Sequence, residues 1–278
     1  MLNHYLMKLN KTLLLALFLF TVIGCGNISA KSDRPEPVVS NEPKKTESRL
    51  YEKSSNMENE KGTSAATVSN TVKTVKKEHG YRNGDKYLAK YQNNPAVRQM
   101  ILVEQSEAER STGKLYLLVK KENDGWRELL QCKAFLGKNG IDKAREGDAR
   151  TPTGDYGMLM AFGAKDDPGS LVPYTKLTDT MFLCGDKEYY NQFIDVSKVR
   201  HTCSKNSEHL IRYIPQYNYA LFFDYNKDNI YGKGSAIFLH CFGSYPYTMG
   251  CVSVSEENMI KILKTVDKNA RVCIYPYK

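Results

Sequence analysis

The stretch Ala236–Met259, AIFLHCFGSYPYTMGCVSVSEENM, decides how we expect this chain to fold. An apolar run leads in and ends at His240, and a run of helical character leads out after Cys251. A cysteine attacks only as the thiolate, whose formation is favoured beside a histidine or at a helix N-terminus. The pattern therefore predicts a strand ending at His240, a helix starting after Cys251, and an imidazole within reach of the sulfur.

Short strands separated by turns are predicted on both sides of this stretch. Residues 115–121 and 126–137 flank an Asp-Gly turn, which is a strong hairpin signal. Further strands are expected at 155–163, 210–217, 219–225, 234–241 and 270–276. These elements favour a mostly β sandwich or barrel with a helix after Cys251.

The expected helix has a capping residue and one apolar face. Either Ser253 or Ser255 can cap it. Met259, Leu263 and Val266 follow at helical spacing.

The N-terminal part of the chain reads as an export signal and a tether. Residues 1–24 combine a basic start with a short apolar run, which is typical of a secretory signal. Val22-Ile23-Gly24-Cys25 resembles a bacterial lipobox, so we expect lipidation of Cys25, with an uncleaved anchor as the alternative. Residues 25–71 have few apolar side chains and balanced charges, which predicts a disordered tether. We expect a helical or capping segment at 72–113 and a catalytic domain at 114–278.

The formal net charge of +9 lies mostly on the expected folded part. Basic surfaces attract polyanions, which for an exported protein are cell-wall polymers and lipid headgroups. Simple surface solubility is the alternative, and no nucleic-acid motif is present. The seven cysteines show no zinc-ligand spacing, so we expect no metal. Cys184 and Cys203 are possible disulfide partners, and the sequence does not decide whether they pair.

The spacing of His240, Gly250 and Cys251 fits acyl transfer through a thioester. His240 would act as base and then as acid, with Cys251 as nucleophile. Gly250 allows close approach of a substrate, and the amides of Gly250 and Cys251 could bind an oxyanion. Alternation along a strand predicts that Cys241 faces the core if His240 faces the site. The competing interpretation is that Cys251 is a buried small hydrophobe.

Two segments together resemble the L,D-transpeptidase (YkuD-type) family over roughly residues 115–277. They are GKNGIDKAREGDARTPTGDYGM and LHCFGSYPYTMGCVSV. The matching residues are Gly147, Asp148, Thr151, Pro152, Gly154, His240, Thr248, Gly250 and Cys251. The resemblance implies a mostly β fold in which cysteine attacks peptidoglycan stem peptides before D-Ala and transfers the acyl group to an amine of another stem. It implies no cofactor.

The sequence departs from the usual family pattern at two positions. Met249 stands where the family commonly has His, and Ser253 where it has Arg. We treat Thr248, Met249, Ser253 and Arg150 as candidate substrate-binding residues.

Two histidines and two tyrosines outside the motif residues leave alternatives open. His201 and His209 could replace the missing histidine or could simply be exposed to solvent. Tyr245 and Tyr247 could form a lid or could be packing residues.

The expected function is therefore a peptidoglycan L,D-transpeptidase that acts as a monomer, lipid-anchored at the outer face of the cytoplasmic membrane. Its partners would be stem peptides and the membrane, and not nucleic acid. The alternatives are an L,D-carboxypeptidase, with water as acceptor, and a catalytically silent wall-binding module.

Overall fold

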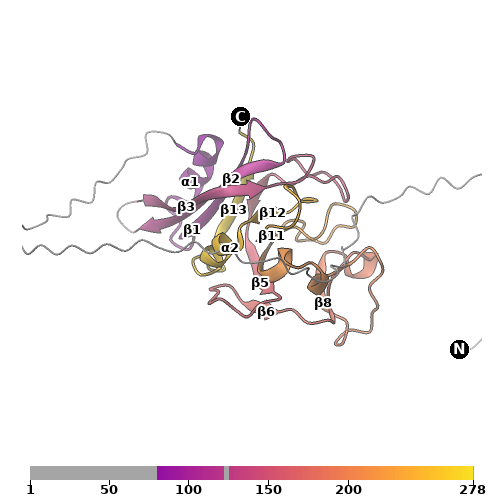
Figure 1. The fold of residues 1–278 in the computed structure, drawn as a ribbon. Coiled ribbons are helices and arrows are strands. Elements are labelled where there is room, and N and C mark those ends of the chain that lie inside the picture. Colours follow the sequence, from indigo (N-terminus) through magenta and orange to yellow (C-terminus); the bar gives the residue numbers. More distant parts are fainter. Residues whose placement is uncertain (1–79, 122–124, 278) are drawn as a thin grey trace, which may run out of the picture. The chain divides into compact units, whose positions relative to one another are not determined.

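A computed structural model describes residues 80–121 and 125–277, and a ten-stranded sheet dominates it (Figure 1). The strand order is β4-β13-β1-β2-β3-β12-β11-β10-β5-β6, which mixes parallel and antiparallel pairs. The strands are β1 (Gln99–Gln105), β2 (Thr112–Lys121), β3 (Gly125–Phe135), β4 (Gly154–Tyr156), β5 (Met158–Gly163), β6 (Tyr174–Lys176), β10 (Ala220–Phe223), β11 (Phe238–Cys241), β12 (Val252–Val254) and β13 (Arg271–Tyr275).

Alternation along the strands divides the side chains between two faces of this sheet. Leu239 and Cys241 of β11 point to the larger core, whereas Phe238 belongs to a second cluster on the other face. The larger core also receives the apolar face of helix α2 (Glu256–Leu263). Met259, Leu263 and Val266 are all fully buried there, as their spacing predicts.

The opposite face of the sheet is covered in two separate places. Helix α1 (Asp85–Tyr91) packs its apolar and aromatic side chains against β1, β2 and β13. Over β5, β10 and β11 lies a cluster that includes Leu183 of a three-stranded sheet, ordered β8-β7-β9. That smaller sheet consists of β7 (Met181–Cys184), β8 (Gln192–Asp195) and β9 (Glu208–His209).

Most of the expected elements are present, and the mostly β architecture is confirmed. The hairpin appears as β2 and β3, whose ladder runs from Thr112–Phe135 to Lys121–Gly125. Ser255, and not Ser253, caps α2 by accepting a hydrogen bond from the Asn258 amide.

Two expectations about the elements were wrong. Residues 99–105 form β1, although we placed them in a segment expected to be helical or capping; only Asp85–Tyr91 of that segment form an α-helix among the described residues. The backbone of β1 pairs with β2 on one side and with β13 on the other, so sheet ladders take the place of helical hydrogen bonds. Residues 210–217, expected as a strand, contain 3-10 turns at Leu210–Arg212 and Gln216–Asn218.

The expected signal, Cys25 and the tether lie outside the described residues. Within the described part of the chain, no helix is both long enough and apolar enough to cross a membrane.

Candidate active site

Strands β11 and β12 bring the two central residues of the opening stretch to one face of the sheet. They pair in parallel, with His240 opposite Ser253. Cys251 lies two residues before Ser253, so its side chain points to the same side as His240. That side carries the cluster of Phe238 and Cys251, whereas Cys241 lies in the larger core, as alternation predicts.

His240 is buried and held in one tautomer. Its Nδ1 lies 2.7 Å from the carbonyl oxygen of Cys241. A carbonyl can only accept a hydrogen bond, so Nδ1 carries the proton and Nε2 keeps a free lone pair. Burial lowers the pKa of His240 to about 4, although the hydrogen bond to the carbonyl acts in the opposite direction. The imidazole is therefore neutral near pH 7 and has its basic nitrogen available.

The thiol of Cys251 is also neutral in this structure. It donates to the Ala236 carbonyl at 3.1 Å and accepts from the Phe238 amide at 3.3 Å. Burial raises its pKa to about 12, and the negative charge of Glu208 adds to this. The Phe238 amide and the Lys143 ammonium act in the opposite direction.

The expected help from a helix N-terminus is absent. Cys251 leads directly into strand β12, and α2 begins only at Glu256. The stabilisation of an anion by a helix falls off within its first turn, so the dipole of α2 does not act on this sulfur. The expectation of a thiol with a lowered pKa was wrong for this arrangement, in which the thiol and the imidazole are both neutral. The thiol bonds to Ala236 and Phe238 and not to His240, so the two groups share a sheet face without a hydrogen bond between them.

The carbonyl of Cys251 is fixed by two threonines that lie far apart in the sequence. Thr248 Oγ1 donates to it at 2.6 Å and Thr151 Oγ1 at 3.1 Å. Each hydroxyl also accepts a backbone N–H, Thr248 from Gly250 and Thr151 from Gly137. Both threonines are buried. The hairpin motif and the cysteine motif therefore meet at the backbone of Cys251.

Gly250 lies where its backbone passes close to the 137–154 segment. Its φ of +147° lies in a region that favours glycine. A Cβ here would be only 3.0 Å from the carbonyl oxygen of Arg150 and 3.1 Å from Ile237. Its amide, which we expected to bind an oxyanion, donates to Thr248 in this structure. Oxyanion binding by this amide would require Thr248 to release it.

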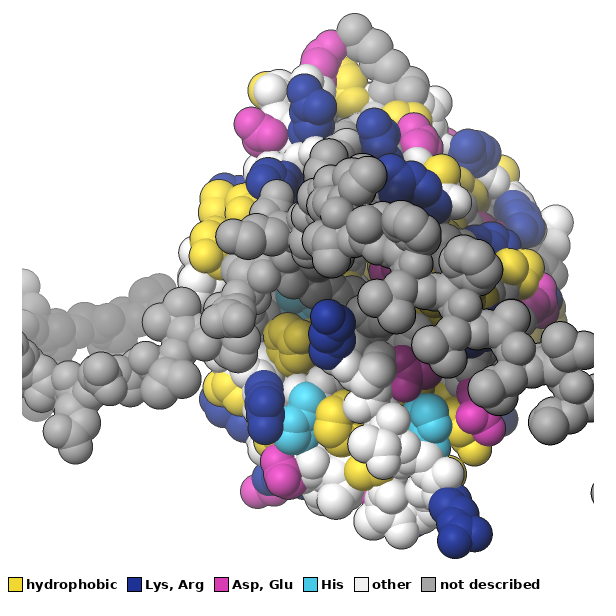
Figure 2. Space-filling model, turned by 90° about the vertical axis from the view of Figure 1, so that its right-hand side faces the viewer, with side chains coloured by type: hydrophobic (Ala, Val, Ile, Leu, Met, Phe, Trp, Pro, Cys, Tyr) yellow, Lys and Arg dark blue, Asp and Glu magenta, His cyan; other side chains and the backbone are white. Residues whose placement is uncertain are grey.

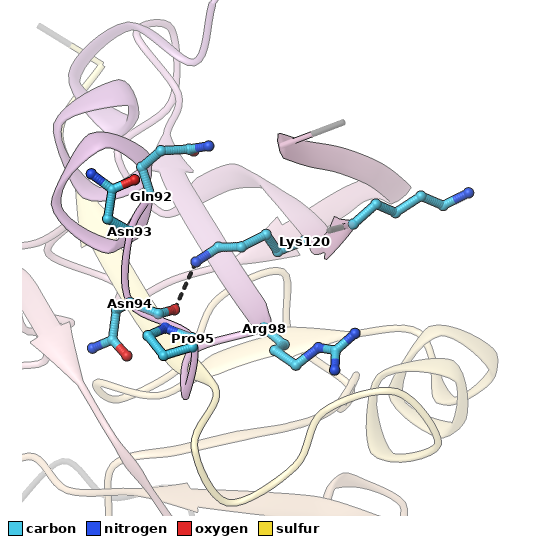
Figure 3. Close-up of a pocket in the computed structure, with 7 residues that line it drawn as sticks. Gln92, Asn93, Asn94, Pro95, Arg98 and Lys120 are labelled. Carbon is cyan, nitrogen blue, oxygen red and sulfur yellow. Dashed lines mark hydrogen bonds between the residues drawn. The ribbon is translucent and has the colours of Figure 1, made fainter. Parts of the chain in front are cut away.

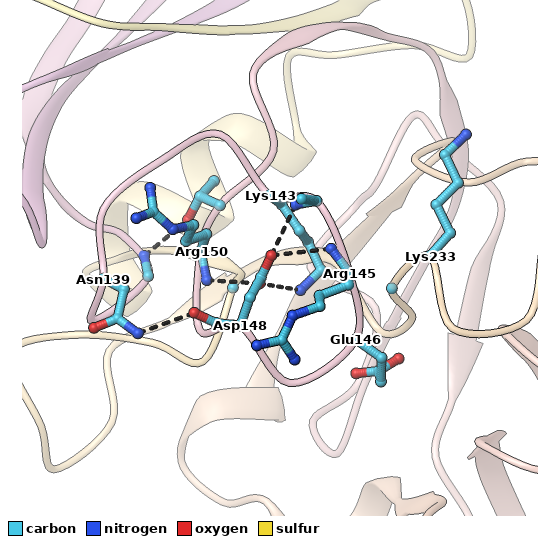
Figure 4. A network of polar contacts seen from close by, with 12 residues as sticks. Asn139, Lys143, Arg145, Glu146, Asp148, Arg150 and Lys233 are labelled. Carbon is cyan, nitrogen blue, oxygen red and sulfur yellow. Dashed lines mark hydrogen bonds and ion pairs between the residues drawn. The ribbon is translucent and has the colours of Figure 1, made fainter.

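A buried ion pair organises the same segment (Figure 4). Lys143 Nζ lies 2.8 Å from Asp148 Oδ1, and the two side chains are only 2% and 9% exposed. Asp148 also accepts three backbone amides, from Ala144, Arg145 and Arg150. Burial alone would raise the pKa of Asp148, but these hydrogen bonds, led by that of Lys143, hold it below its usual value. The ion pair and the hydrogen bonds of Asp148 thus fix the segment that carries Thr151.

Tyr217 and Glu208 cover the site from the side of the smaller sheet. The Tyr217 ring packs edge-on against His240, with ring centroids 5.6 Å apart. Its hydroxyl donates to Glu208 at 2.7 Å. This pair was not identified from the sequence, because the only local signal was a tyrosine in a segment that we expected to be a strand.

Comparison with known proteins now identifies the family. The family model of the L,D-transpeptidase catalytic domain (YkuD) matches residues 99–274. The chain belongs to the YkuD family of L,D-transpeptidase catalytic domains. No curated protein matches the chain.

Solved structures resemble this L,D-transpeptidase domain only distantly. L,D-transpeptidase 1 of Mycobacterium tuberculosis is 12% identical, with a TM-score of 0.28 over 63% of this chain and 62% of that one. An L,D-transpeptidase from Mycobacterium smegmatis is 13% identical, with a TM-score of 0.30 over 63% of this chain and 58% of that one. This chain therefore covers less than two thirds of either structure.

The remaining candidates of the L,D-transpeptidase domain occupy different environments. Ser253 is buried opposite His240, whereas the Met249 side chain is 46% exposed. Arg150 donates from Nη1 to the Ile141 carbonyl at 2.9 Å (Figure 4). Tyr245 and Tyr247 lie in the loop before Cys251, and their rings stack on each other. Tyr245 is exposed, so it is not a core residue. Contacts of all these residues with substrate stay predictions.

Neither of the two other candidate histidines replaces the missing one. His209 stacks on Phe182 and bonds to the Asp179 carbonyl, and His201 contacts Cys184. Both side chains are only 14% exposed, so the interpretation as solvent-exposed residues was also wrong. Their partners place both histidines on the smaller sheet and its loops.

Two surface features lie outside the candidate active site. A polar hollow between the end of α1 and the end of β2 is lined by Asn94, Arg98 and Lys120, among others (Figure 3). Lys120 donates there to the Asn94 carbonyl at 2.8 Å. On the visible part of the face in Figure 2, basic side chains are scattered among acidic and hydrophobic ones and form no continuous stripe.

Proposed function

We propose that the protein is a cysteine L,D-transpeptidase that acts on peptidoglycan stem tetrapeptides. The observation that carries the proposal is the neutral His240 imidazole, with Nδ1 bonded to the Cys241 carbonyl and Nε2 therefore unprotonated, on the same sheet face as Cys251. Membership of the L,D-transpeptidase family supports the reaction type.

The first half of the reaction forms a thioester. The thiol leaves the Ala236 carbonyl and gives its proton to His240 Nε2 as the sulfur attacks the carbonyl carbon before D-Ala. Collapse of the tetrahedral intermediate breaks the C–N bond, and the imidazolium returns the proton to the nitrogen of the departing D-Ala. The products are free D-Ala and an acyl-Cys251 thioester.

The second half transfers the acyl group. The amine of another stem attacks the thioester and loses a proton to His240 Nε2, and a new amide bond forms. The thiolate leaves and takes the proton back from the imidazolium, which restores the neutral pair. With water as acceptor, the same steps give a carboxypeptidase.

We further propose that the domain works at the outer face of the cytoplasmic membrane, held through a lipid on Cys25. The lipobox-like residues and the polar stretch 25–71 support this placement. The placement would give the domain access to the cell wall. Mass spectrometry of the membrane fraction tests it, because a lipidated N-terminus at Cys25 has a distinct mass.

The test of the reaction is incubation of the full-length protein with stem tetrapeptides, followed by mass spectrometry. We expect D-Ala release and a cross-linked dimer in the wild type and in Cys132→Ala, and neither product in Cys251→Ala. Release of D-Ala without a dimer would identify the carboxypeptidase. If neither product depends on Cys251, and no carbapenem adduct forms on that residue, the proposed enzyme is refuted and the wall-binding alternative remains.

A further inference from the structure

The smaller sheet brings together two cysteines and a histidine. Cys184 ends strand β7, and His201 and Cys203 lie on the loop between β8 and β9. One ligand atom of each lies within 4.8 Å of the others, and Cys184 Sγ is 3.4 Å from His201 Nε2. Cys184 and Cys203 were considered only as possible disulfide partners, because the three residues show no standard zinc-ligand spacing.

The distance between Cys184 and His201 matches that between two ligands of a tetrahedral zinc ion. Zinc binds cysteine sulfur at about 2.3 Å and histidine nitrogen at about 2.0–2.1 Å, which places the two atoms roughly 3.6 Å apart. The observed 3.4 Å between Cys184 Sγ and His201 Nε2 is close to that separation. Two thiolates and an imidazole are also the ligand types that zinc prefers.

The surrounding residues are those of a supported metal site. Glu188 Oε2 lies 4.0 Å from His201 Nδ1, the nitrogen that faces away from Cys184. Metal-binding histidines usually donate from their second nitrogen to a carboxylate or carbonyl, and Glu188 is the carboxylate that could move into hydrogen-bond distance for this role. Ser207 donates to Cys184 Sγ at 3.6 Å, and Asp186 Oδ2 lies 3.3 Å from His201 Nε2.

We propose that Cys184, His201 and Cys203 bind one zinc ion. The fourth position is open to water or to the neighbouring Asp186 carboxylate. Binding converts two thiols into thiolates and releases two protons, and no electron transfer is involved.

The ion would fix the small sheet that covers the catalytic face. Leu183, next to the ligand Cys184, packs in the same cluster as Cys251. Glu208 of β9 holds Tyr217 over His240. Zinc at this site would therefore join the 196–207 loop to β7 and stabilise the cover, without taking part in acyl transfer.

Zinc titration of the reduced, chelator-treated full-length protein tests the proposal independently of catalysis. In competition with a chromophoric chelator, we expect one tightly bound zinc per chain. Affinity should fall at least 100-fold in Cys184→Ser and in Cys203→Ser, and should be unchanged in Cys132→Ser, a half-buried cysteine on β3. Loss of the carboxylate beside His201 Nδ1 in Glu188→Gln should weaken zinc binding by about 10-fold or more.

Cobalt binding by the wild type gives a readout that does not depend on the folding of variants. We expect the intense absorption of thiolate-to-cobalt charge transfer and of tetrahedral coordination. A reduced wild type that binds zinc no better than the Cys184→Ser/Cys203→Ser double variant would overturn the proposal. So would a chain isolated with a Cys184–Cys203 disulfide that takes up neither metal after reduction.

Discussion

The hydroxyl of Thr151 lies 3.1 Å from the carbonyl oxygen of Cys251, a residue one hundred positions later in the chain. Thr248 donates to the same oxygen from the other motif. A buried carbonyl with two donors is strongly fixed, and the position of Cys251 follows from it. The two motifs that resemble the family thus each supply one threonine that fixes the backbone of Cys251.

We predict that Thr151→Val and Thr248→Val each lower the free energy of unfolding by about 1–3 kcal/mol. One donor to the carbonyl remains in each variant, but the backbone N–H of Gly137 or Gly250 loses its acceptor. The double variant should lose more than the sum of the single losses, because the carbonyl is then left without either hydroxyl. Urea denaturation of the four proteins completes the cycle. Thr153→Val is the control, since its hydroxyl bonds to Asp142 at an exposed position. Additive losses would show that the two hydroxyls act independently.

Gly250→Ala should reduce both stability and acyl transfer. The new Cβ would meet the Arg150 carbonyl at 3.0 Å, and the backbone adopts a positive φ. We expect a loss of about 1–3 kcal/mol, measured by denaturation, with slower carbapenem acylation of Cys251. Gly232→Ala separates the two causes, because Gly232 also has a positive φ but nothing lies within 4 Å of its added Cβ. Equal losses in the two variants would argue against the close approach.

The sequence could predict the parts of the fold that depend on local patterns. The β2–β3 hairpin, the capped helix α2 and the opposite orientations of His240 and Cys241 all follow from turn chemistry and alternation. Residues 99–105 were misread because Ile101 and Leu102 fit a helical period as well as a buried strand. Only the pairing with β13, near the other end of the chain, decides between them.

The chemical environment of the candidate site was harder to predict from the sequence than the residues that form it. Cys251 and His240 were identified from spacing and family resemblance. Burial raises the pKa of Cys251 and lowers that of His240. The residues that bury them, Tyr217 among them, come from segments far away in the sequence. No local pattern connects Glu208 with a cysteine more than forty residues later.

Lys143→Met should destabilise the protein by about 3 kcal/mol, because it leaves the buried Asp148 carboxylate without its cation. Lys261→Met is the matched control, since its ion pair with Glu257 is exposed and screened by solvent. Chemical denaturation at neutral pH measures both losses. A loss in Lys143→Met no larger than that of the control would contradict the importance of the buried pair.

The same variant should change the pH dependence of stability. The pKa of Asp148 is lowered in the folded state, so its contribution is present above the unfolded value of about 3.9 and is lost as the pH falls below it. Without Lys143, the pKa of Asp148 should be lowered less, because the hydrogen bond from the ammonium group is lost. The difference in unfolding free energy between neutral pH and about pH 3 should therefore be smaller in Lys143→Met than in the wild type. An unchanged difference would assign the acid sensitivity to other groups.

The pH profile of Cys251 acylation distinguishes a neutral pair from a preformed thiolate. With the pKa of His240 at about 4 and that of Cys251 at about 12, the pair keeps one protonation state across the neutral range. If His240 removes the proton during attack, the rate of carbapenem acylation should be nearly constant from about pH 6 to 9 and should decline only in acid, as the imidazole becomes protonated. A rate that rises tenfold per pH unit over this range would instead mean that the thiol ionises before attack. His240→Ala should lower the plateau by about 100-fold or more, and the remaining rate should then rise with pH, because only thiolate formed without the base can react.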